Sequence, residues 1–456
     1  MTTAERSPVT RGADLHSRNI FPALTVAAAT VVLAARLFGV IQKYSVNILY
    51  SDQWDYLGLF FQDQASIVKL FLHQHGPHRE GLGLLPDKAL YPVTHWNSRV
   101  DSFVIGIIIL AATLAALRLK CKLFGPLDYA DVFIPVVFLS LEQFETLLDV
   151  PNPAPYAFPL LLIMLYCLAL LCQARGLRYT LVLVVNFFLI YTGYGVVMGV
   201  TTLGVFLLEC YWSWRRISTI PLAQPLAVLV LAVMSLACFF IHYRILRGVG
   251  CFDSHSFSVF RYPEFIALMF GASVVPNHRH FWAMMIVGGV ILLGAAIIAG
   301  YHKFRLLRRG HSDADLIGAV LLIFCLLFSL SAALGRACMG LHEAFQSRHH
   351  TLLIPAFLAI YFFLLSKLRG SKGTFVLAVM IALLLPATLL KPTIVVQQLA
   401  SSKREWAGCY VRTHSISYCN ENVLVLYPSP DKNRMQEKLD YLERHHLNFF
   451  YDATSK

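Results

Sequence analysis

Acidic, basic and imidazole side chains concentrate in one polar stretch, Ser51 to Glu80, which follows the first long apolar segment of the chain. The residues that offer chemistry there are Asp52, Asp55, His73, His75, His78, Arg79 and Glu80. A carboxylate held at the depth of lipid headgroups can take a proton from a hydroxyl group. Asp52 and Asp55 bracket Trp54, whose indole favours that depth, although an aspartate at a membrane edge also commonly caps a helix. We predict Asp52 as a general base, Asp55 as the second choice, and Trp54 as an anchor and sugar-binding group.

The histidines and the arginine of this stretch fit anion recognition better than metal binding. Arg79 beside His78 can bind a phosphate, because a guanidinium matches phosphate oxygens in bidentate fashion. Three histidines close together could also indicate a metal ion, but Gly76-Pro77 interrupts them and the spacing fits neither one helix face nor a zinc-binding loop. We therefore expect no metal or other cofactor. A divalent ion, or a polar loop that binds nothing, stays an open alternative.

Later segments supply further cations. Gly335-Arg336 ends one apolar segment and Ser347-Arg348-His349-His350 begins the next. Cations on the outer side run against the usual bias of Lys and Arg toward the cytoplasm, so they need a reason, which is either contact with anionic headgroups or stabilisation of a phosphate. We favour the second. The predicted phosphate-binding set is His78, Arg79, Arg336, Arg348 and His349.

Polar groups also close an earlier apolar segment at Glu142, Gln143 and Glu145. Binding of sugar hydroxyls and simple termination of a helix would explain them equally well. The predicted acceptor- or sugar-binding set is Trp54, Glu80, Glu142, Gln143 and Glu145.

The composition defines the elements that must position these groups. With 57% hydrophobic and 14% charged residues, the chain predicts an all-α polytopic membrane protein. About eleven crossings are expected, at 20–42, 100–118, 128–144, 156–173, 178–192, 194–212, 222–243, 281–301, 314–334, 352–367 and 374–390. The net charge of +12 comes from short Lys and Arg clusters between apolar segments, a pattern of cytoplasmic loops and not of nucleic-acid binding.

The alternation of these basic clusters predicts a cytoplasmic N-terminus and a C-terminus on the outer side. Residues 1–391 are expected to form the transmembrane domain, with 43–99 as its catalytic outer loop, and residues 392–456 a small appendage outside the membrane. Segments 56–72 and 262–275 are predicted as helices that lie in the bilayer interface. In the appendage we expect a strand-like run at Asn422–Tyr427 and a helical stretch at Lys432–His445. Pairing of Cys409 with Cys419 is left open.

These motifs resemble bacterial polytopic glycosyltransferases of the GT-C class, which take sugars from polyprenyl-phosphate carriers. The resemblance rests on Ser51-Asp52-Gln53-Trp54-Asp55 after the first span, His78-Arg79 in the same loop, Glu142 to Glu145, and Gly335-Arg336 with Ser347-Arg348-His349. It implies an inverting transfer from a polyprenyl-phosphate donor to a glycan or glycolipid acceptor of the cell envelope, such as a polysaccharide or lipopolysaccharide, at the outer (periplasmic) face of the inner membrane. Asp52 would be the base, and arginines would stabilise the phosphate that leaves. The chain departs from the pattern at His349, where a tyrosine is expected, and at Glu80, where an apolar residue is expected.

Other classes remain alternatives. A flippase or small-molecule transporter would be expected to carry charges at mid-depth in the membrane, where these spans have few. An oligosaccharide ligase would share the lipid-linked donor and the outer arginines but would use a lipid diphosphate. A structural subunit of an envelope complex would need no acid-base residues.

Overall fold

The computed structural model describes residues 20–62, 66–245, 251, 258–275, 280–310, 312–367, 381, 393–423 and 434–454. These residues form an all-α protein, as predicted. Within the described ranges the only strands are β1 (Gln74–His75) and β2 (His78–Arg79). They form one short antiparallel hairpin in which Gln74 lies opposite Arg79 and His75 opposite His78.

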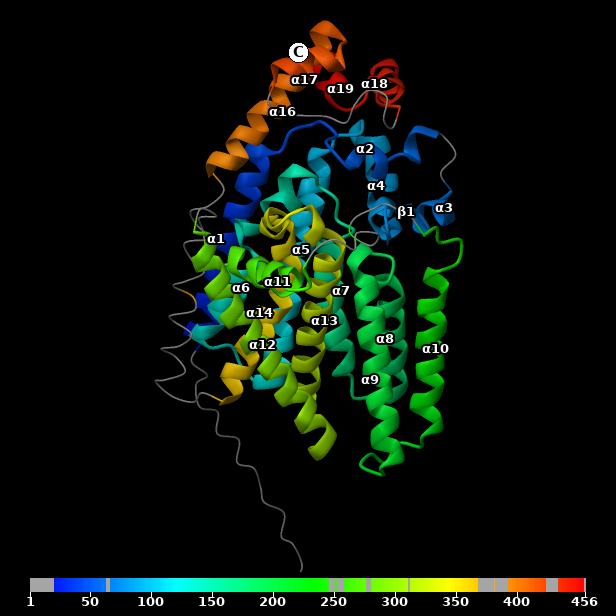
Figure 1. The fold of residues 1–456 in the computed structure, drawn as a ribbon, viewed down its shortest axis with the longest axis vertical. Coiled ribbons are helices and arrows are strands. Elements are labelled where there is room, and N and C mark those ends of the chain that lie inside the picture. Colours follow the sequence, from blue (N-terminus) through cyan, green and yellow to red (C-terminus); the bar gives the residue numbers. More distant parts are fainter. Residues whose placement is uncertain are drawn as a thin grey trace, which may run out of the picture.

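Long apolar helices form the lower part of the molecule in Figure 1. Six described helical segments are long and apolar enough to cross a membrane, which confirms a polytopic membrane protein, although the number eleven is not confirmed. Their helices are α1 (Phe21–Tyr44), α5 (Arg99–Phe124), α9 (Val196–Trp214), α12 (Phe281–Arg309), α13 (Asp313–Arg336) and α14 (Arg348–Lys367). Shorter helices lie among them, namely α7 (Ala157–Leu170), α8 (Arg175–Leu189) and α10 (Ala223–Phe239). The span predicted at 374–390 lies outside the described residues except for Ile381.

The span predicted at 128–144 is not one continuous helix. It is divided into η2 (Tyr129–Val132), α6 (Phe133–Phe138) and η3 (Leu141–Gln143), followed by the π-helical turn η4 (Glu145–Asp149). The break has a local cause, because Ser140 is extended and its hydroxyl accepts a hydrogen bond from the Glu142 N–H, which starts a new turn. The Gln143 amide then donates to the carbonyls of Phe138 and Ser140, which the broken helix leaves without helical partners.

Neither predicted interfacial helix has the expected form. Segment 56–72 is divided among α2 (Gln53–Tyr56), η1 (Phe60–Gln62) and α3 (Ile67–Phe71), and α3 begins where Ser66 caps the Lys69 N–H. Segment 262–275 does form a helix, α11 (Arg261–Ala272), but its apolar residues are buried in the protein. A Cβ on Gly288 of α12 would lie 1.8 Å from the Ala267 carbonyl oxygen, so only glycine permits this approach of α11 to α12.

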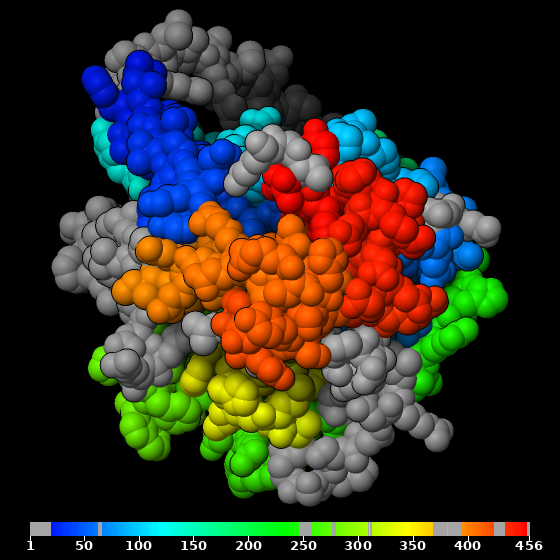
Figure 2. Space-filling model, turned by 90° about the horizontal axis from the view of Figure 1, so that it is seen from above, coloured from blue at the N-terminus to red at the C-terminus, as the bar shows by residue number. Residues whose placement is uncertain are grey.

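The C-terminal residues form a second helical layer above the spans. Its helices are α16 (Thr393–Thr413), α17 (Ile416–Asn422), α18 (Met435–Arg444) and α19 (Phe449–Thr454). Seen from above in Figure 2, these orange and red residues lie across the top of the molecule against blue residues of the loop after α1. The helical stretch predicted at Lys432–His445 corresponds to α18. Of the predicted strand, Asn422 ends α17, and residues 424–427 lie outside the described ranges.

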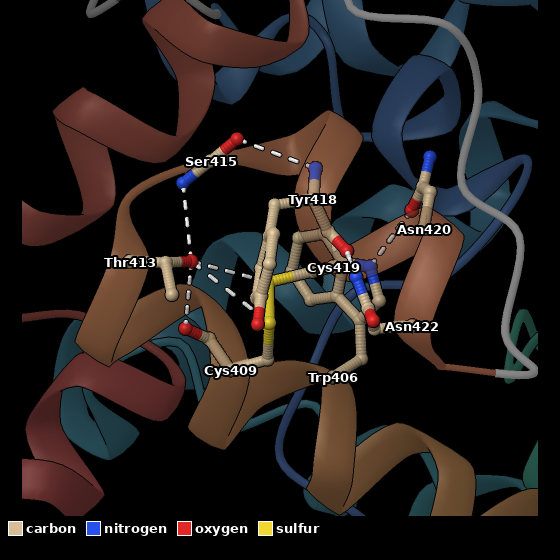
Figure 3. Close-up of a disulfide and its surroundings, with 8 residues drawn as sticks. All are labelled: Trp406, Cys409, Thr413, Ser415, Tyr418, Cys419, Asn420 and Asn422. Atoms are coloured by element: carbon tan, nitrogen blue, oxygen red, sulfur yellow. Dashed lines mark hydrogen bonds between the residues drawn. A yellow bond between two sulfur atoms is a disulfide. The ribbon is translucent and has the colours of Figure 1, made fainter.

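The appendage and the outer loop share one hydrophobic core, so the appendage does not pack as a separate unit. Trp54, Tyr91 and Trp96 of the loop are buried with Trp406 and Leu439 of the appendage. Tyr91 belongs to α4 (Gly81–Thr94), the main helix of the loop. Cys409 and Cys419 form a disulfide that joins α16 to α17 (Figure 3). The pairing that the sequence left open is therefore present.

Candidate active site

The ends of several spans, together with loop 43–99, surround a cavity of about 570 Å³. Its walls come from the outer loop, η4, the ends of α10 and α13, and the starts of α9 and α14. The lining residues with polar or charged side chains include Asp52, His75, His78, Glu80, Glu145, Asp149, Asn152, Tyr156, Tyr194, Tyr243, Arg336 and Arg348. Segments that are far apart in the sequence therefore meet at one place, and six of the predicted site residues are among them.

The opposite ends of the spans carry the basic turns. The indole of Trp212, at the end of α9, donates to the Leu306 carbonyl of α12 at 2.8 Å, and Lys367 of α14 lies over the Tyr301 ring, 4.5 Å from its centre. The basic residues Arg215, Arg216, Arg308 and Lys367 thus lie at the ends of α9, α12 and α14 away from the cavity.

Asp52 stands at the cavity with an uncommitted carboxylate. Its side chain is exposed and, among the described residues, it accepts no hydrogen bond and forms no ion pair. The backbone around it is well fixed, because the Gln53 amide is buried and donates to the Pro151 carbonyl at 2.9 Å. Ser51, directly before it, has a φ of 51°, a conformation that costs a non-glycine residue on the order of 1 kcal/mol and recurs at functional sites. Asp52 is therefore held in place yet free to accept a proton.

His75 of the β1–β2 hairpin and Glu80, directly after it, form a partly buried ion pair beside Asp52. His75 Nδ1 lies 3.5 Å from Glu80 Oε2, and Asn152 donates to the same oxygen at 2.8 Å. Burial would lower the pKa of His75, but its hydrogen bond to Glu80 and the charges of Glu80 and Asp52 raise this pKa to about 9. Burial would raise the pKa of the Glu80 carboxyl, but His75, His78 and Asn152 bring it below its ordinary value. The pair is therefore charged at neutral pH, and Glu80 is not free to act as a base.

His78 has the opposite character. Burial lowers the pKa of His78 to about 4, with the charges of Arg336 and His75 adding to the shift. Its ring lies 4.6 Å from the ring of Tyr194, measured between centres. His78 is thus a neutral imidazole in the cavity wall, which can donate or accept a hydrogen bond but adds no positive charge to the predicted phosphate site.

Arg336 and Arg348 form the cationic wall. Arg336 ends α13, and its Nη1 donates to Glu343 Oε2 at 3.3 Å and to Gln346 Oε1 at 3.2 Å. Arg348 begins α14, and its Nε donates to the same Gln346 oxygen at 2.8 Å. Two guanidinium groups thus meet at one neutral oxygen beside the cavity, an arrangement suited to an anion with several oxygens.

The η4 turn brings two further carboxylates to the cavity. The Arg348 N–H donates to Glu145 Oε2 at 3.3 Å, and the Glu145 N–H donates to Ser347 Oγ at 2.9 Å. Burial raises the pKa of the Glu145 carboxyl, and the charge of Arg348 offsets part of that shift. Burial likewise raises the pKa of Asp149, against the charge of Lys403. Lys403 reaches in from α16 and donates to the carbonyls of Leu148 and Asp149, which links the appendage to the cavity wall.

A disulfide braces the turn that follows Arg336. Cys251 is bonded to Cys338 of η6 (Ala337–Met339), and the Cys251 N–H donates to the Gly335 carbonyl at 3.2 Å. Met339, which lines the cavity, is 54% exposed, and Phe240 on the α10 side is 60% exposed. One side of the cavity therefore has an apolar rim at the level where helices α10 and α13 end.

Arg79 does not lie at the cavity, contrary to the prediction. Its side chain is buried and its Nε donates to the Phe239 carbonyl at 2.7 Å, while its terminal nitrogens donate to the carbonyls of Leu72 and Ile241. All three nitrogens thus bind backbone oxygens, two of them at the end of α10. Arg79 fastens the hairpin to α10, and three of its five N–H donors are used by backbone carbonyls away from the cavity.

Asp55 and Trp54, which were also predicted as site residues, do not line the cavity. Asp55 turns to the appendage, where its carboxylate lies 3.6 Å from Lys438 Nζ of α18. Trp54 is fully buried in the core shared with the appendage, its ring stacked on Phe61, so it contacts neither sugar nor headgroups. The helix α2 is only four residues long, and its successive side chains diverge to different sides of the loop.

Glu142, Gln143 and His349 lie behind the cavity wall. Glu142 and Gln143 are buried, and the side-chain amide of Gln143 accepts from Thr351 and donates to the carbonyls of Phe138 and Ser140, so helix termination explains Gln143. His349 is 1% exposed and packs against the rings of Phe265 and Phe328. The helical turn that points Arg348 toward the cavity directs the next side chain into the core.

Tyr156, Tyr194 and Asp149 line the cavity but were not predicted from the sequence. Tyr156 follows the Pro151–Pro155 turn, and Tyr194 lies in a Gly-Tyr-Gly turn before α9, so each stands at the outer end of a span. That position was the only signal. Comparisons with known proteins add nothing further, since no family model, no curated protein and no solved structure matches this chain.

Proposed function

We propose that this protein is a membrane glycosyltransferase that transfers a sugar from a polyprenyl-phosphate donor to a hydroxyl group of a cell-envelope glycan or lipid. One observation carries the proposal. A single cavity at the outer ends of the spans combines the uncommitted carboxylate of Asp52 with the guanidinium groups of Arg336 and Arg348. In such a transfer the acceptor hydroxyl loses a proton, which Asp52 can accept. The phosphate of the donor leaves, and Arg336 and Arg348 can stabilise its charge.

The proposed reaction is a single displacement with inversion. Asp52 accepts the proton of the acceptor hydroxyl while the oxygen attacks the anomeric carbon. The bond between that carbon and the phosphate oxygen breaks, and its electron pair leaves with the polyprenyl phosphate. Arg336 and Arg348 stabilise the charge that develops on the phosphate, the contribution that is usually largest in such sites.

The rim of the cavity suits a lipid-linked donor. The polyprenyl tail must stay in the bilayer, because each CH₂ group moved into water costs about 0.8 kcal/mol. Phe240 and Met339 give the cavity an apolar, exposed edge on the side of α10 and α13. We propose that the tail leaves the cavity between these two residues, with the phosphate at the arginines.

The proposed reaction requires that the cavity faces the outer side of the membrane, which is an oxidising compartment. The Cys251–Cys338 and Cys409–Cys419 disulfides both lie on the cavity side of the spans, and disulfides persist outside the cytoplasm. The basic turns lie at the opposite ends, where cytoplasmic loops would be. Both features favour the inner membrane with the cavity and the C-terminus on the periplasmic side and the N-terminus in the cytoplasm.

A transporter gains less support. Two ion pairs of largely buried side chains, Lys120 with Asp131 at 2.7 Å and Glu209 with Arg178 at 3.3 Å, lie near the ends of the spans opposite the cavity. Transport sites are expected near mid-depth instead. Mid-span polar contacts such as Thr202 with Asn186 carry no charge.

Reconstitution separates these functions. The full chain in liposomes would be given a panel of polyprenyl-phosphate monosaccharides and envelope glycan acceptors, and both lipid and glycan products would be identified by mass spectrometry. We expect transferred sugar and an equal amount of polyprenyl phosphate. Intact donor that moves across the bilayer would instead indicate a flippase, and turnover only with lipid-diphosphate donors would indicate a ligase.

A further inference from the structure

Gln346 stands behind the two arginines of the cavity. It lies between η7 (Leu341–Phe345) and α14, and it does not line the cavity itself. Its Oε1 accepts from Arg336 Nη1 at 3.2 Å, from Arg348 Nε at 2.8 Å and from Arg348 Nη2 at 2.5 Å. Its Nε2 donates to Glu343 Oε2, which also accepts from Arg336. One amide thus connects both guanidinium groups and a carboxylate.

The network fixes which end of the amide faces the cations. A carboxylate can only accept, so Glu343 requires the NH₂ end of Gln346, and the oxygen is left for the arginines. Two guanidinium groups that share one neutral acceptor repel each other, and a carboxylate in place of the amide would attract both more strongly. It would also cancel their charge. Glu343 already offsets one positive charge, so these four side chains carry a net charge of +1, with the Glu145 carboxylate beside Arg348 as the neighbouring acid.

We infer that Gln346 is a positioning residue of the proposed phosphate site, which sets the spacing of Arg336 and Arg348 while it leaves their charge available. The inference rests on the proposed function only for the nature of the anion, the phosphate of a polyprenyl phosphate. Its own content is that the amide at position 346 must be both a hydrogen-bond acceptor and neutral. A residue with a purely structural role would need only the first property.

Substitutions of equal size separate the two properties. Gln346→Glu keeps acceptor oxygens for the arginines but removes the net positive charge, and a unit charge about 6 Å from the phosphate at an effective dielectric constant of about 20 weakens binding by about 10²-fold. Glu343→Gln adds a positive charge and should tighten binding by at least about 10-fold. The double variant Glu343→Gln with Gln346→Glu restores the charge, and we expect affinity within a few-fold of the wild type.

The assay measures binding and not sugar transfer. The full chain in nanodiscs is titrated with a polyprenyl monophosphate that carries no sugar, and with the uncharged polyprenol for comparison. Glu437→Gln, the same change as Glu343→Gln on exposed α18, serves as the matched control and should leave binding unchanged. A thermal melt shows which variants are folded. If Gln346→Glu does not fold, the test passes to Glu343→Gln and the double variant.

The inference is overturned if folded Gln346→Glu binds the phosphate like the wild type, if the double variant binds no better than Gln346→Glu, or if Glu343→Gln does not tighten binding. It is also overturned if the wild type does not prefer the phosphate to the alcohol. If the affinities follow the predicted order while no sugar is transferred in the reconstituted assay, the inference stands and the proposed transferase activity fails.

Discussion

The outer loop has one face toward the cavity and one toward the appendage, and the same residue types have different roles on the two faces. On the cavity face, the Asp52 carboxylate has no partner among the described residues, and the His75–Glu80 pair lies beside it. On the appendage face, Asp55 is paired with Lys438, and the Trp54 carbonyl accepts from the same ammonium group at 2.6 Å. The arginines divide similarly, because Arg336 lines the cavity whereas Arg79 binds backbone carbonyls. Asp52 thus differs from Asp55 in its carboxylate, which is unpaired within the described ranges, and Arg336 differs from Arg79 in its place at the cavity.

The Asp52 and Asp55 pair offers the largest test of this difference. Asp52→Asn removes the proposed base without a change of size and should lower the transfer rate by about 10²–10⁴-fold, the usual effect of losing a general base. Asp55→Asn should leave the rate within a few-fold and lower stability slightly, since it weakens a contact to the appendage. Initial rates of sugar transfer, with thermal melts of both variants, check this. Equal rates for Asp52→Asn and the wild type would remove Asp52 from the mechanism.

Substitution of Arg79 should lower stability, whereas substitution of Arg348 should lower the affinity for the lipid phosphate. Arg79→Met leaves three backbone carbonyls without a donor, and buried hydrogen bonds to a charged group contribute about 1.5–3 kcal/mol each, so a stability loss of about 3 kcal/mol or more is expected. Arg348→Met should keep the melting temperature but lose affinity for polyprenyl phosphate. Melting temperature and lipid affinity would be measured for both. A stable but inactive Arg79→Met protein would indicate that Arg79 binds the phosphate and would contradict its assignment as a structural residue.

The two disulfides should differ in the same way. Serine in place of Cys409 and Cys419 opens a small loop in the appendage and should cost about 2–3 kcal/mol with little effect on rate. Serine in place of Cys251 and Cys338 loosens the turn after Arg336, so the expected loss is in catalytic rate as well as stability. Rates and melts of the two double variants provide the comparison. Equal rates in both would show that the Cys251–Cys338 bond does not position Arg336.

The smallest expected effect is a pH dependence from the hairpin. The pKa of His75 is raised in the fold to about 9 from an ordinary 6.5, so the protonated form is favoured in the native state. Its contribution to stability is complete below pH 6.5 and is lost as the pH rises toward 9. His75→Gln should therefore have a flatter stability profile than the wild type between these values. Parallel slopes across this window would contradict the charged His75–Glu80 pair.

The membrane architecture followed from the sequence because it depends on composition and segment length. The break at Ser140 did not, since it depends on one hydroxyl and one amide that replace helical hydrogen bonds. In the site, Asp52, Arg336 and Arg348 could be predicted because each stands at the outer end of a span. Arg79 could not be assigned, because an arginine that caps carbonyls and one that binds phosphate look alike in sequence.

The core that the loop 43–99 shares with the appendage could not be predicted either, because it depends on contacts between segments far apart in the sequence. Trp54 was predicted as an interfacial anchor, but it is buried against α16 and α18, some 300 residues or more along the chain. The sequence carries no local mark of such a partner. The same is true of Lys403, whose contact with the η4 carbonyls connects the appendage to the cavity.

A structure of the protein with a polyprenyl phosphate bound would test the central claim most directly. We predict density for the phosphate within hydrogen-bonding distance of Arg336 and Arg348, with Asp52 facing it across the cavity and the tail leaving past Phe240 and Met339. A phosphate bound outside this cavity, with Arg336 and Arg348 still engaged only by Gln346 and Glu343, would contradict the proposed site and the mechanism built on it.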